Sequence, residues 1–177
     1  QKSYKAGSRA QWYLKRSTYG GTIAWIGIHM IDLIRFTTGR DIVGVAGVQA
    51  HIGFPELGEM ENVTASLFRL DNGAVGTLRM DYLRSDKAAT HGDDRLRIAG
   101  THGIVEWDAA KGVVLMTSDT APHKLDELPP SGSVFVDYLQ HVYNGKPTEL
   151  PLTDIWRANE ITIAAQEAAD HPNLRPA

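Results

Sequence analysis

The sequence predicts an α+β fold, in which an open, mainly antiparallel β-sheet has helices packed on one face. Two observations carry this prediction. Short β-branched runs are grouped in the middle of the chain, and helical patterns stand at both ends. Glycine-containing turns separate several of the runs, and such turns favour hairpins and therefore antiparallel neighbours.

The first elements lie within residues 1–36. Residues 1–19 are polar and basic and are predicted to form a lead-in segment, with a short helix over 9–16. Gly20-Gly21 break the chain, and an apolar run then continues to Phe36, with Thr22 available as its cap and Gly39 after its end. A glycine just past the last turn is the usual helix stop, so the run is predicted to be a helix.

Six strands are predicted after this helix. The turn Asp71-Asn72-Gly73 favours a hairpin, because Asn-Gly tolerates the positive φ that tight turns require. The segments 100–103 and 109–112 are interpreted in the same way. The predicted strands are 42–52, 62–70, 74–83, 95–100, 103–108 and 112–118.

Two helices are predicted to close the chain. A polar, proline-containing stretch precedes a helix over 135–145, whose apolar residues recur at helical spacing. The last helix runs to about residue 169, with Thr153 as its expected N-cap and Asp154 in its first turn. We therefore expect a lead-in segment over 1–19 and a single α+β domain over 20–177.

Composition excludes several classes of protein. The 177 residues are 42% hydrophobic and carry a net charge of −3, without a basic stripe, so nucleic acid is not an expected partner. Charged side chains interrupt the longest apolar run, so no membrane span is expected. The sequence contains no cysteine, which fits a reducing compartment, and we expect a cytoplasmic protein. Because the chain opens on Gln1 without an initiator Met, we expect a piece of a longer protein.

The apolar run carries two polar residues where a core helix would have leucine or alanine. At 100° per residue, Trp25, His29 and Asp32 fall within roughly an 80° arc of one helix face. One interpretation is an intrahelical His–Asp pair that fixes the imidazole tautomer. The other is a face that lines a substrate cleft, with His29 as general acid and base and Asp32 orienting it or binding a hydroxyl group.

Three further side chains are candidate substrate contacts. Tyr82 and Arg84 follow a hairpin strand and could reach the same cleft, although an ordinary strand end explains them equally. His91 lies in the segment THGDDR (90–95), which could provide metal ligands or substrate contacts, with a solvated loop as the alternative. The segment has no second histidine or glutamate at helical ligand spacing, so no metal site is expected.

The segment GGTIAWIGIHMIDLIRF (20–36) resembles the start of the C-terminal domain of the Gfo/Idh/MocA family of NAD(P)-dependent oxidoreductases, whose usual pattern is G-G-G-x-x-x-D-x-G-x-H-x-x-D. Three later segments resemble the same domain in order and spacing: DNGAVGTLRMDYL, DDRLRIAGTHGIVEW and FVDYLQHVYNGKPTELPLTDIWRANEITIAAQEAA. The resemblance implies an N-terminal Rossmann domain that carries the dinucleotide and a catalytic lysine. The sequence contains no G-x-G-x-x-G loop, so we expect this chain alone to bind no cofactor.

The resemblance also implies roles for individual residues. His29 corresponds to the family's catalytic histidine and Asp32 to the acidic residue one turn later. Trp25 stands where the family has an aspartate, so it is either a sugar-stacking platform or a core residue.

We therefore expect the substrate-binding and oligomerisation domain of an oxidoreductase that uses NAD or NADP in its full-length form. The expected substrate is a sugar, cyclitol or related polyol, and the open sheet face is expected to pair with another copy of the chain. The alternative is a non-catalytic binding or assembly module with the same fold.

Overall fold

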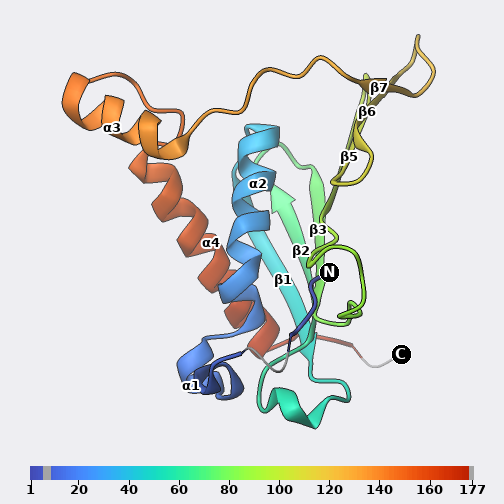
Figure 1. The fold of residues 1–177 in the computed structure, drawn as a ribbon, viewed down its shortest axis with the longest axis vertical. Helices are drawn as coiled ribbons and strands as arrows, with labels where there is room; N and C mark the ends of the chain where they lie inside the picture. Colours follow the sequence, from blue (N-terminus) through green and yellow to red (C-terminus); the bar gives the residue numbers. More distant parts are fainter. Residues whose placement is uncertain (6–8, 176–177) are drawn as a thin grey trace. The chain divides into compact units, whose positions relative to one another are not determined.

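The computed structural model describes residues 1–5 and 9–175, and the chain divides into two compact units (Figure 1). Residues 2–87 and the chain from residue 150 onward form what we call the helix-covered unit. Residue 1 and residues 88–149 form what we call the meander unit. Each unit is described by itself.

The helix-covered unit is a three-stranded antiparallel sheet, in the order β1-β2-β3, with α2 and α4 on one face (Figure 1). In chain order its elements are the 3₁₀-helix η2 (Gln11–Leu14), α1 (Arg16–Tyr19), the π-helix η3 (Ile23–Gly27), α2 (Ile28–Thr38), β1 (Ile42–Ala50), the 3₁₀-helix η4 (Pro55–Leu57), β2 (Val63–Leu70), β3 (Val75–Asp81) and α4 (Leu152–Asp170).

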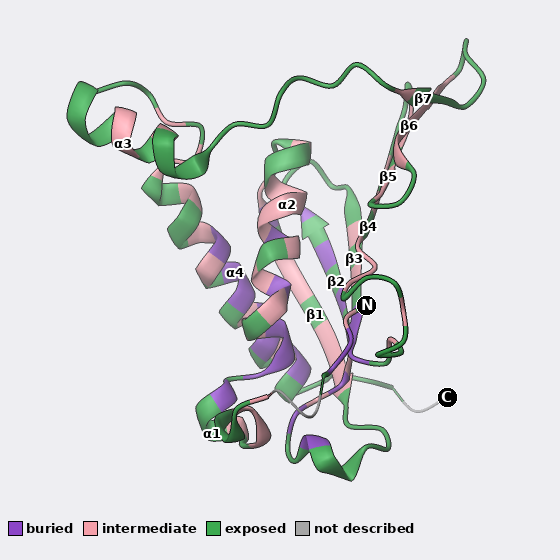
Figure 2. Cartoon of the chain, viewed as in Figure 1, coloured by how far each residue is buried: buried purple, intermediate pink, exposed green. Residues whose placement is uncertain are grey.

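Strand β2 shows how the sequence selects the buried face of this sheet. Its side chains alternate, so that Ser66, Phe68 and Leu70 are buried while Ala65 and Leu67 are exposed. The buried set packs under the two helices, as the purple segments of Figure 2 show. The main core comprises Ile23, Ile31, Ile42, Phe68, Leu70, Met80, Ile161, Ala165 and Ala169.

A second core of the same unit is rich in tyrosine. It lies between the N-terminal segment, η4 and the end of β3, and the partly buried Tyr13 and Ile26 pack against it. Its buried members are Tyr4, Tyr19, Leu57, Met60 and Tyr82. The polar lead-in segment thus contributes Tyr4 and Tyr19 to this core.

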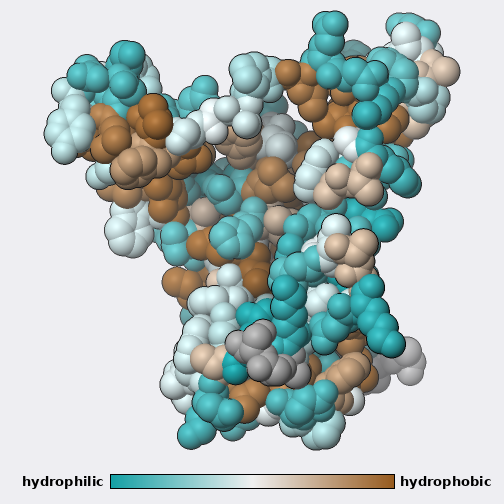
Figure 3. All heavy atoms as spheres, in the orientation of Figure 1, coloured by the Kyte–Doolittle hydropathy of each residue, from teal (hydrophilic) through white to brown (hydrophobic). Residues whose placement is uncertain are grey.

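The meander unit contains a four-stranded antiparallel sheet in the order β4-β5-β6-β7, followed along the chain by α3. Its elements are β4 (Arg95–Gly100), β5 (Gly103–Asp108), β6 (Gly112–Thr117), β7 (His123–Leu125) and α3 (Val134–Asn144). Helix α3 has no buried residue, and hydrophobic surface gathers over it in Figure 3.

The predicted fold class is confirmed, and the six predicted strands are found to within two residues. All three predicted hairpins are present: β2–β3, β4–β5 and β5–β6. The strands nevertheless divide between two sheets, because residues 82–94 separate β3 from β4. The short strand β7 was not predicted, since it lies in the proline-containing stretch.

Two predicted helix caps were wrong. The Thr22 side chain does not cap the helix that follows, because its hydroxyl group donates to the backbone carbonyl of Glu61. Helix α4 begins after Pro151 without a side-chain cap, so Thr153 lies inside the helix. Gly39 does end α2 in the left-handed conformation, as predicted, with its N–H bonded to the Arg35 carbonyl oxygen. No helix in the described ranges combines the length and hydropathy that a membrane span needs.

Candidate active site on η3 and α2

The outer face of η3 and α2 carries the candidate catalytic residues. Trp25 and His29 are exposed and Asp32 is half-buried, whereas Ile23 and Ile31, on the inner face, are completely buried. The predicted common face of Trp25, His29 and Asp32 therefore exists. It is a solvent-facing stripe rather than a polar interruption inside a core.

The run predicted as one α-helix changes type within this face. Residues 23–27 form a π-helix, and the α-helix begins at Ile28, directly before His29. Gly27 allows the close packing here, because a Cβ at this position would lie 3.0 Å from the Met80 Cε. Single π-turns inside helices are rare and recur at functional sites, where they redirect side chains.

His29 and Asp32 are not joined by a hydrogen bond or an ion pair. Neither side chain has such a partner among residues 1–5 and 9–175. The intrahelical pair, one of the two interpretations of the sequence, is therefore absent from this structure. Both polar groups remain available to a ligand on the exposed face.

Trp25 belongs to an aromatic cluster that the N-terminal segment completes. Its ring centre lies 5.3 Å from that of Trp12, 5.4 Å from that of Tyr13 and 6.2 Å from that of Tyr19. Trp25 remains 41% exposed. Trp25 therefore packs against other aromatic rings while part of its surface stays accessible, so the structure agrees in part with both interpretations of the sequence.

Tyr82 lies in the tyrosine-rich core at the end of β3. Its ring makes an edge-to-face contact with Tyr4, and the Arg9 guanidinium lies 5.6 Å from the Tyr82 ring centre. Burial raises the pKa of Tyr82 and, more strongly, that of Tyr19. The Tyr19 hydroxyl shares a 3.1 Å hydrogen bond with Thr22 Oγ1.

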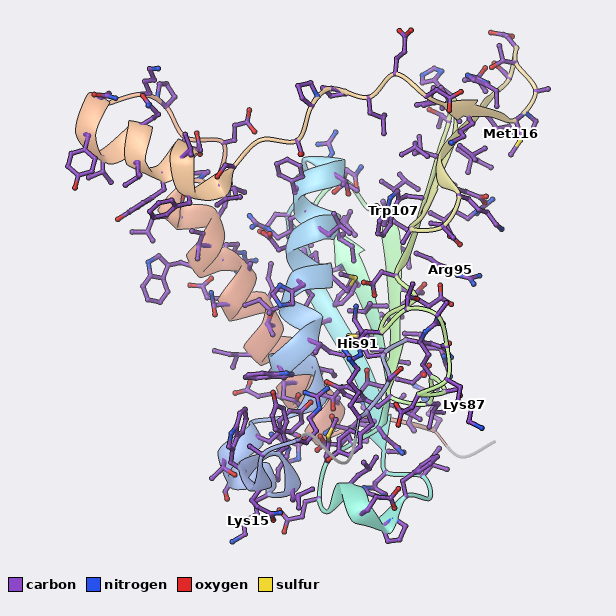
Figure 4. All side chains as sticks on the ribbon, in the orientation of Figure 1. Lys15, Lys87, His91, Arg95, Trp107 and Met116 are labelled. Atoms are coloured by element: carbon purple, nitrogen blue, oxygen red, sulfur yellow. The ribbon has the colours of Figure 1, made fainter. Side chains whose placement is uncertain are left out.

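The remaining two candidates lie elsewhere. Arg84 follows β3 and is half-buried. Its backbone forms an isolated β-bridge with Ser3. His91 is exposed in the meander unit, on the loop before β4 (Figure 4). No group of three or more side chains suited to hold a metal ion occurs in the part of the chain that the structure describes.

An ion-pair network connects the end of α2 to β1 and α4. Arg35 Nε lies 3.2 Å from Asp41 Oδ1, and an Arg35 terminal nitrogen lies 3.1 Å from Asp154 Oδ1. Arg157 Nε donates to both carboxylate oxygens of Asp41, at 3.1 and 3.0 Å. These bonds hold the helix that carries His29 and Asp32 against the rest of the unit.

Sequence reasoning did not single out Trp12 as a site residue. The only sequence signal was the pair Trp12-Tyr13 in an otherwise polar segment. Its partner Trp25 lies thirteen positions away across a break of two glycines, so no local periodicity connects the two side chains.

Comparison with known proteins places these features in a wider context. The family model described as the GFO/IDH/MocA C-terminal domain matches residues 1–106. No match was found among curated proteins.

Solved structures of oxidoreductases share the fold. A Thermotoga maritima protein assigned as an oxidoreductase is 37% identical, with a TM-score of 0.88 over 97% of this chain and 51% of its own. Aldose-aldose oxidoreductase from Caulobacter crescentus, complexed with glycerol, is 24% identical, with a TM-score of 0.70 over 90% of this chain and 49% of its own. An Agrobacterium radiobacter oxidoreductase in complex with NAD+, L-tartaric acid and magnesium is 19% identical, with a TM-score of 0.69 over 82% of this chain and 46% of its own. The chain thus spans about half the length of the structures that it matches.

Proposed function

Because the chain belongs to the GFO/IDH/MocA C-terminal domain family, we propose that it is the substrate-binding and oligomerisation part of an NAD(P)-dependent oxidoreductase. The proposed substrate is a sugar, cyclitol or related polyol. The fold neighbour named for aldoses and complexed with glycerol supports this class. The absence of cysteine from the sequence fits the reducing cytoplasm, which we propose as its location.

One observation carries the proposal: His29 and Asp32 lie on the same exposed helix face without partners among the described residues. A group that must reach a substrate hydroxyl has to be accessible and free of competing bonds. Imidazole can accept and return a proton near neutral pH, so His29 would take the proton from that hydroxyl group. Asp32 would orient the imidazole or bind a neighbouring hydroxyl group. Tyr82, Arg84 and His91 remain proposed substrate contacts.

The dinucleotide does not fit residues of this chain. No G-x-G-x-x-G loop occurs in the sequence, so no glycine-rich turn brings backbone N–H groups to a pyrophosphate at a helix start. We therefore place NAD or NADP, the hydride carrier, on a separate Rossmann domain. The NAD+ complex of a fold neighbour supports this choice of cofactor. Calorimetric titration of the 177-residue chain should detect no dinucleotide binding, and a micromolar dissociation constant would refute this assignment.

The test of the catalytic role uses the protein that joins this chain to its dinucleotide-binding half. His29→Ala should lower kcat by about 100-fold or more, since a positioned general acid or base contributes about 10²–10⁴. Asp32→Asn should do less if it only orients the imidazole. The control is Thr37→Ala, an exposed α2 residue whose hydroxyl bonds to the helix's own Leu33 carbonyl oxygen. Because His29 is exposed, its removal should leave the melting temperature almost unchanged.

The alternative function is a non-catalytic binding or assembly module. The observation in its favour is Trp25, which replaces the family's aspartate and packs into an aromatic cluster. Turnover that stays at the wild-type value in correctly folded His29→Ala would contradict the catalytic role of His29 and leave this chain with a binding or assembly role only.

A further inference from the structure

Two indoles lie together beside the exposed face that carries His29. The ring centres of Trp12 and Trp25 are 5.3 Å apart, with their planes inclined by 71°. Trp12 is 40% exposed and Trp25 is 41% exposed. Trp25 precedes His29 by four residues, and both are exposed along η3 and α2.

A layer of tyrosine holds these indoles in place. Tyr13 stacks on Trp12 with ring centres 3.9 Å apart, and its ring meets Trp25 edge-to-face at 5.4 Å. The Arg9 guanidinium lies 4.7 Å from the Tyr13 ring centre. Thr18 Oγ1 donates to the Trp12 carbonyl oxygen at 2.6 Å. The exposed ring surfaces are thus preorganised, which lowers the entropic cost of binding a ligand.

The other two tryptophans of the chain lack this arrangement. Neither Trp107 nor Trp156 contacts another aromatic ring among the described residues, although Trp156 is 63% exposed. Single exposed apolar side chains are common and need no functional explanation. The pair formed by Trp12 and Trp25 is different, because two adjacent indoles pack on tyrosine about one helical turn from the candidate catalytic histidine. This arrangement calls for a functional explanation.

The chemistry of an indole face selects a particular kind of polyol. The π-face is electron-rich and apolar, so it favours contact with C–H groups that carry slight positive charge. A six-membered ring with mainly equatorial hydroxyl groups presents such a face of axial hydrogens. An open-chain polyol has no continuous C–H face.

We propose that Trp12 and Trp25 form a stacking subsite for a pyranose or cyclitol ring with mainly equatorial hydroxyl groups. The inference rests on the proposed function and narrows its substrate class to ring-form molecules. It also gives the N-terminal segment a role in substrate selection. At the position where the family has an aspartate, Trp25 would then contact the C–H face of the ring.

The test follows the four indole N–H signals of the ¹⁵N-labelled 177-residue chain, assigned with single Trp→Phe variants. Titration with methyl β-D-glucopyranoside should shift the Trp12 and Trp25 signals and leave the Trp107 and Trp156 signals in place. D-glucitol at the same concentration should shift neither pair. Absence of any shift, equal shifts of all four signals, or equal shifts with D-glucitol would each overturn the proposal.

Variants add a second measurement. Trp12→Leu should raise the dissociation constant for methyl β-D-glucopyranoside by at least about fivefold. This is the smallest loss of affinity expected when one stacking aromatic side chain is removed. Trp156→Leu, also an exposed indole, should leave it unchanged. In the longer protein, Trp12→Leu should raise KM with kcat nearly constant, whereas the proposed function is judged by kcat of His29→Ala. Failure of the subsite and failure of the catalytic assignment therefore give different results.

Discussion

Asp41 accepts hydrogen bonds from two arginines, which come from α2 and α4. Partial burial opposes its ionisation, but the bonds and charges of Arg157 and Arg35 outweigh this effect and hold the pKa of Asp41 below its ordinary value. A carboxyl whose pKa is lower in the folded state stabilises that state above the unfolded pKa, which is about 4. The stabilisation is lost as the pH falls through the lowered folded-state pKa.

Asp41→Asn should therefore lower the free energy of unfolding by about 1 kcal/mol at pH 7, the upper end for partly exposed ion pairs. The difference between variant and wild type should shrink as the pH falls below about 4, where the wild-type carboxyl also becomes neutral. Urea unfolding at pH 7 and pH 3 measures both values. Asp86→Asn is the control, because Asp86 is exposed and has no ion pair among the described residues. A difference as large at pH 3 as at pH 7 would contradict the assignment.

The candidate site was predictable only where its residues break a local pattern. His29 and Asp32 were found because they interrupt an apolar helix, and their common face follows from helical geometry alone. The role of Trp12 depends on its contact with Trp25, which forms only when the N-terminal segment folds onto η3. The burial of Tyr82 likewise depends on Tyr4 and Arg9, which are distant in sequence.

At the level of elements, β1 and α4 pack closely against each other in the main core. A Cβ at Gly47 would lie 3.1 Å from the Ala169 Cβ and 3.3 Å from the Ala165 carbonyl oxygen. The alanines at positions 165 and 169 present small side chains to the strand, so the helix backbone approaches it closely. Any larger residue at position 47 must push α4 away from the sheet.

Gly47→Ala should accordingly destabilise the chain by about 1–3 kcal/mol, the usual cost of overpacking a core. Gly44→Ala is the matched control on the same strand, because its Cβ would meet Arg69 Cβ at an ordinary contact distance of 3.5 Å. Thermal or urea unfolding of the two variants compares them directly. Equal stabilities would show that α4 can move away without cost.

Strands and hairpins were predictable because their signals are local. A turn such as Asp71-Asn72-Gly73 determines which two strands pair, and Gly73 has the positive φ that the turn needs. The division into two sheets could not be predicted, because it depends on residues 82–94. Nothing in the sequence of that segment indicates that β3 and β4, which flank it, do not pair with each other. The π-helix was also missed, since its sequence has the same apolar periodicity as an α-helix.

On the scale of the whole molecule, α2 and α4 cover one face of the sheet in the helix-covered unit, and no helix among the described residues of this unit lies on the other face. That face carries Leu67, which is 50% exposed, and a hollow of about 490 Å³ that is lined in part by Leu67, Val48 and Leu174. The exposed apolar side chains support the proposal that this face pairs with a second copy of the chain.

The chain should accordingly self-associate at micromolar concentration, and Leu67→Asp should shift it to the 19.4 kDa monomer, because a buried unpaired carboxylate is costly. Ile163→Asp is the control, since Ile163 is an exposed apolar residue on α4 rather than on the sheet. Light scattering after size-exclusion chromatography gives the masses. A wild-type chain that is monomeric throughout would rule out this interface for the chain alone.

Helix α3 has no buried side chain, although Phe135, Tyr138 and Tyr143 are among its residues. An isolated helix of eleven residues is only marginally stable in water, because nucleation costs more than so few hydrogen bonds return. Its amide hydrogens therefore lack the protection that packing gives to β1 and α4. In a cell, chaperones and proteases can bind the exposed aromatic side chains of such a segment without global unfolding of the chain. Binding of any partner to α3 should therefore slow degradation of the chain, because the partner would cover these side chains.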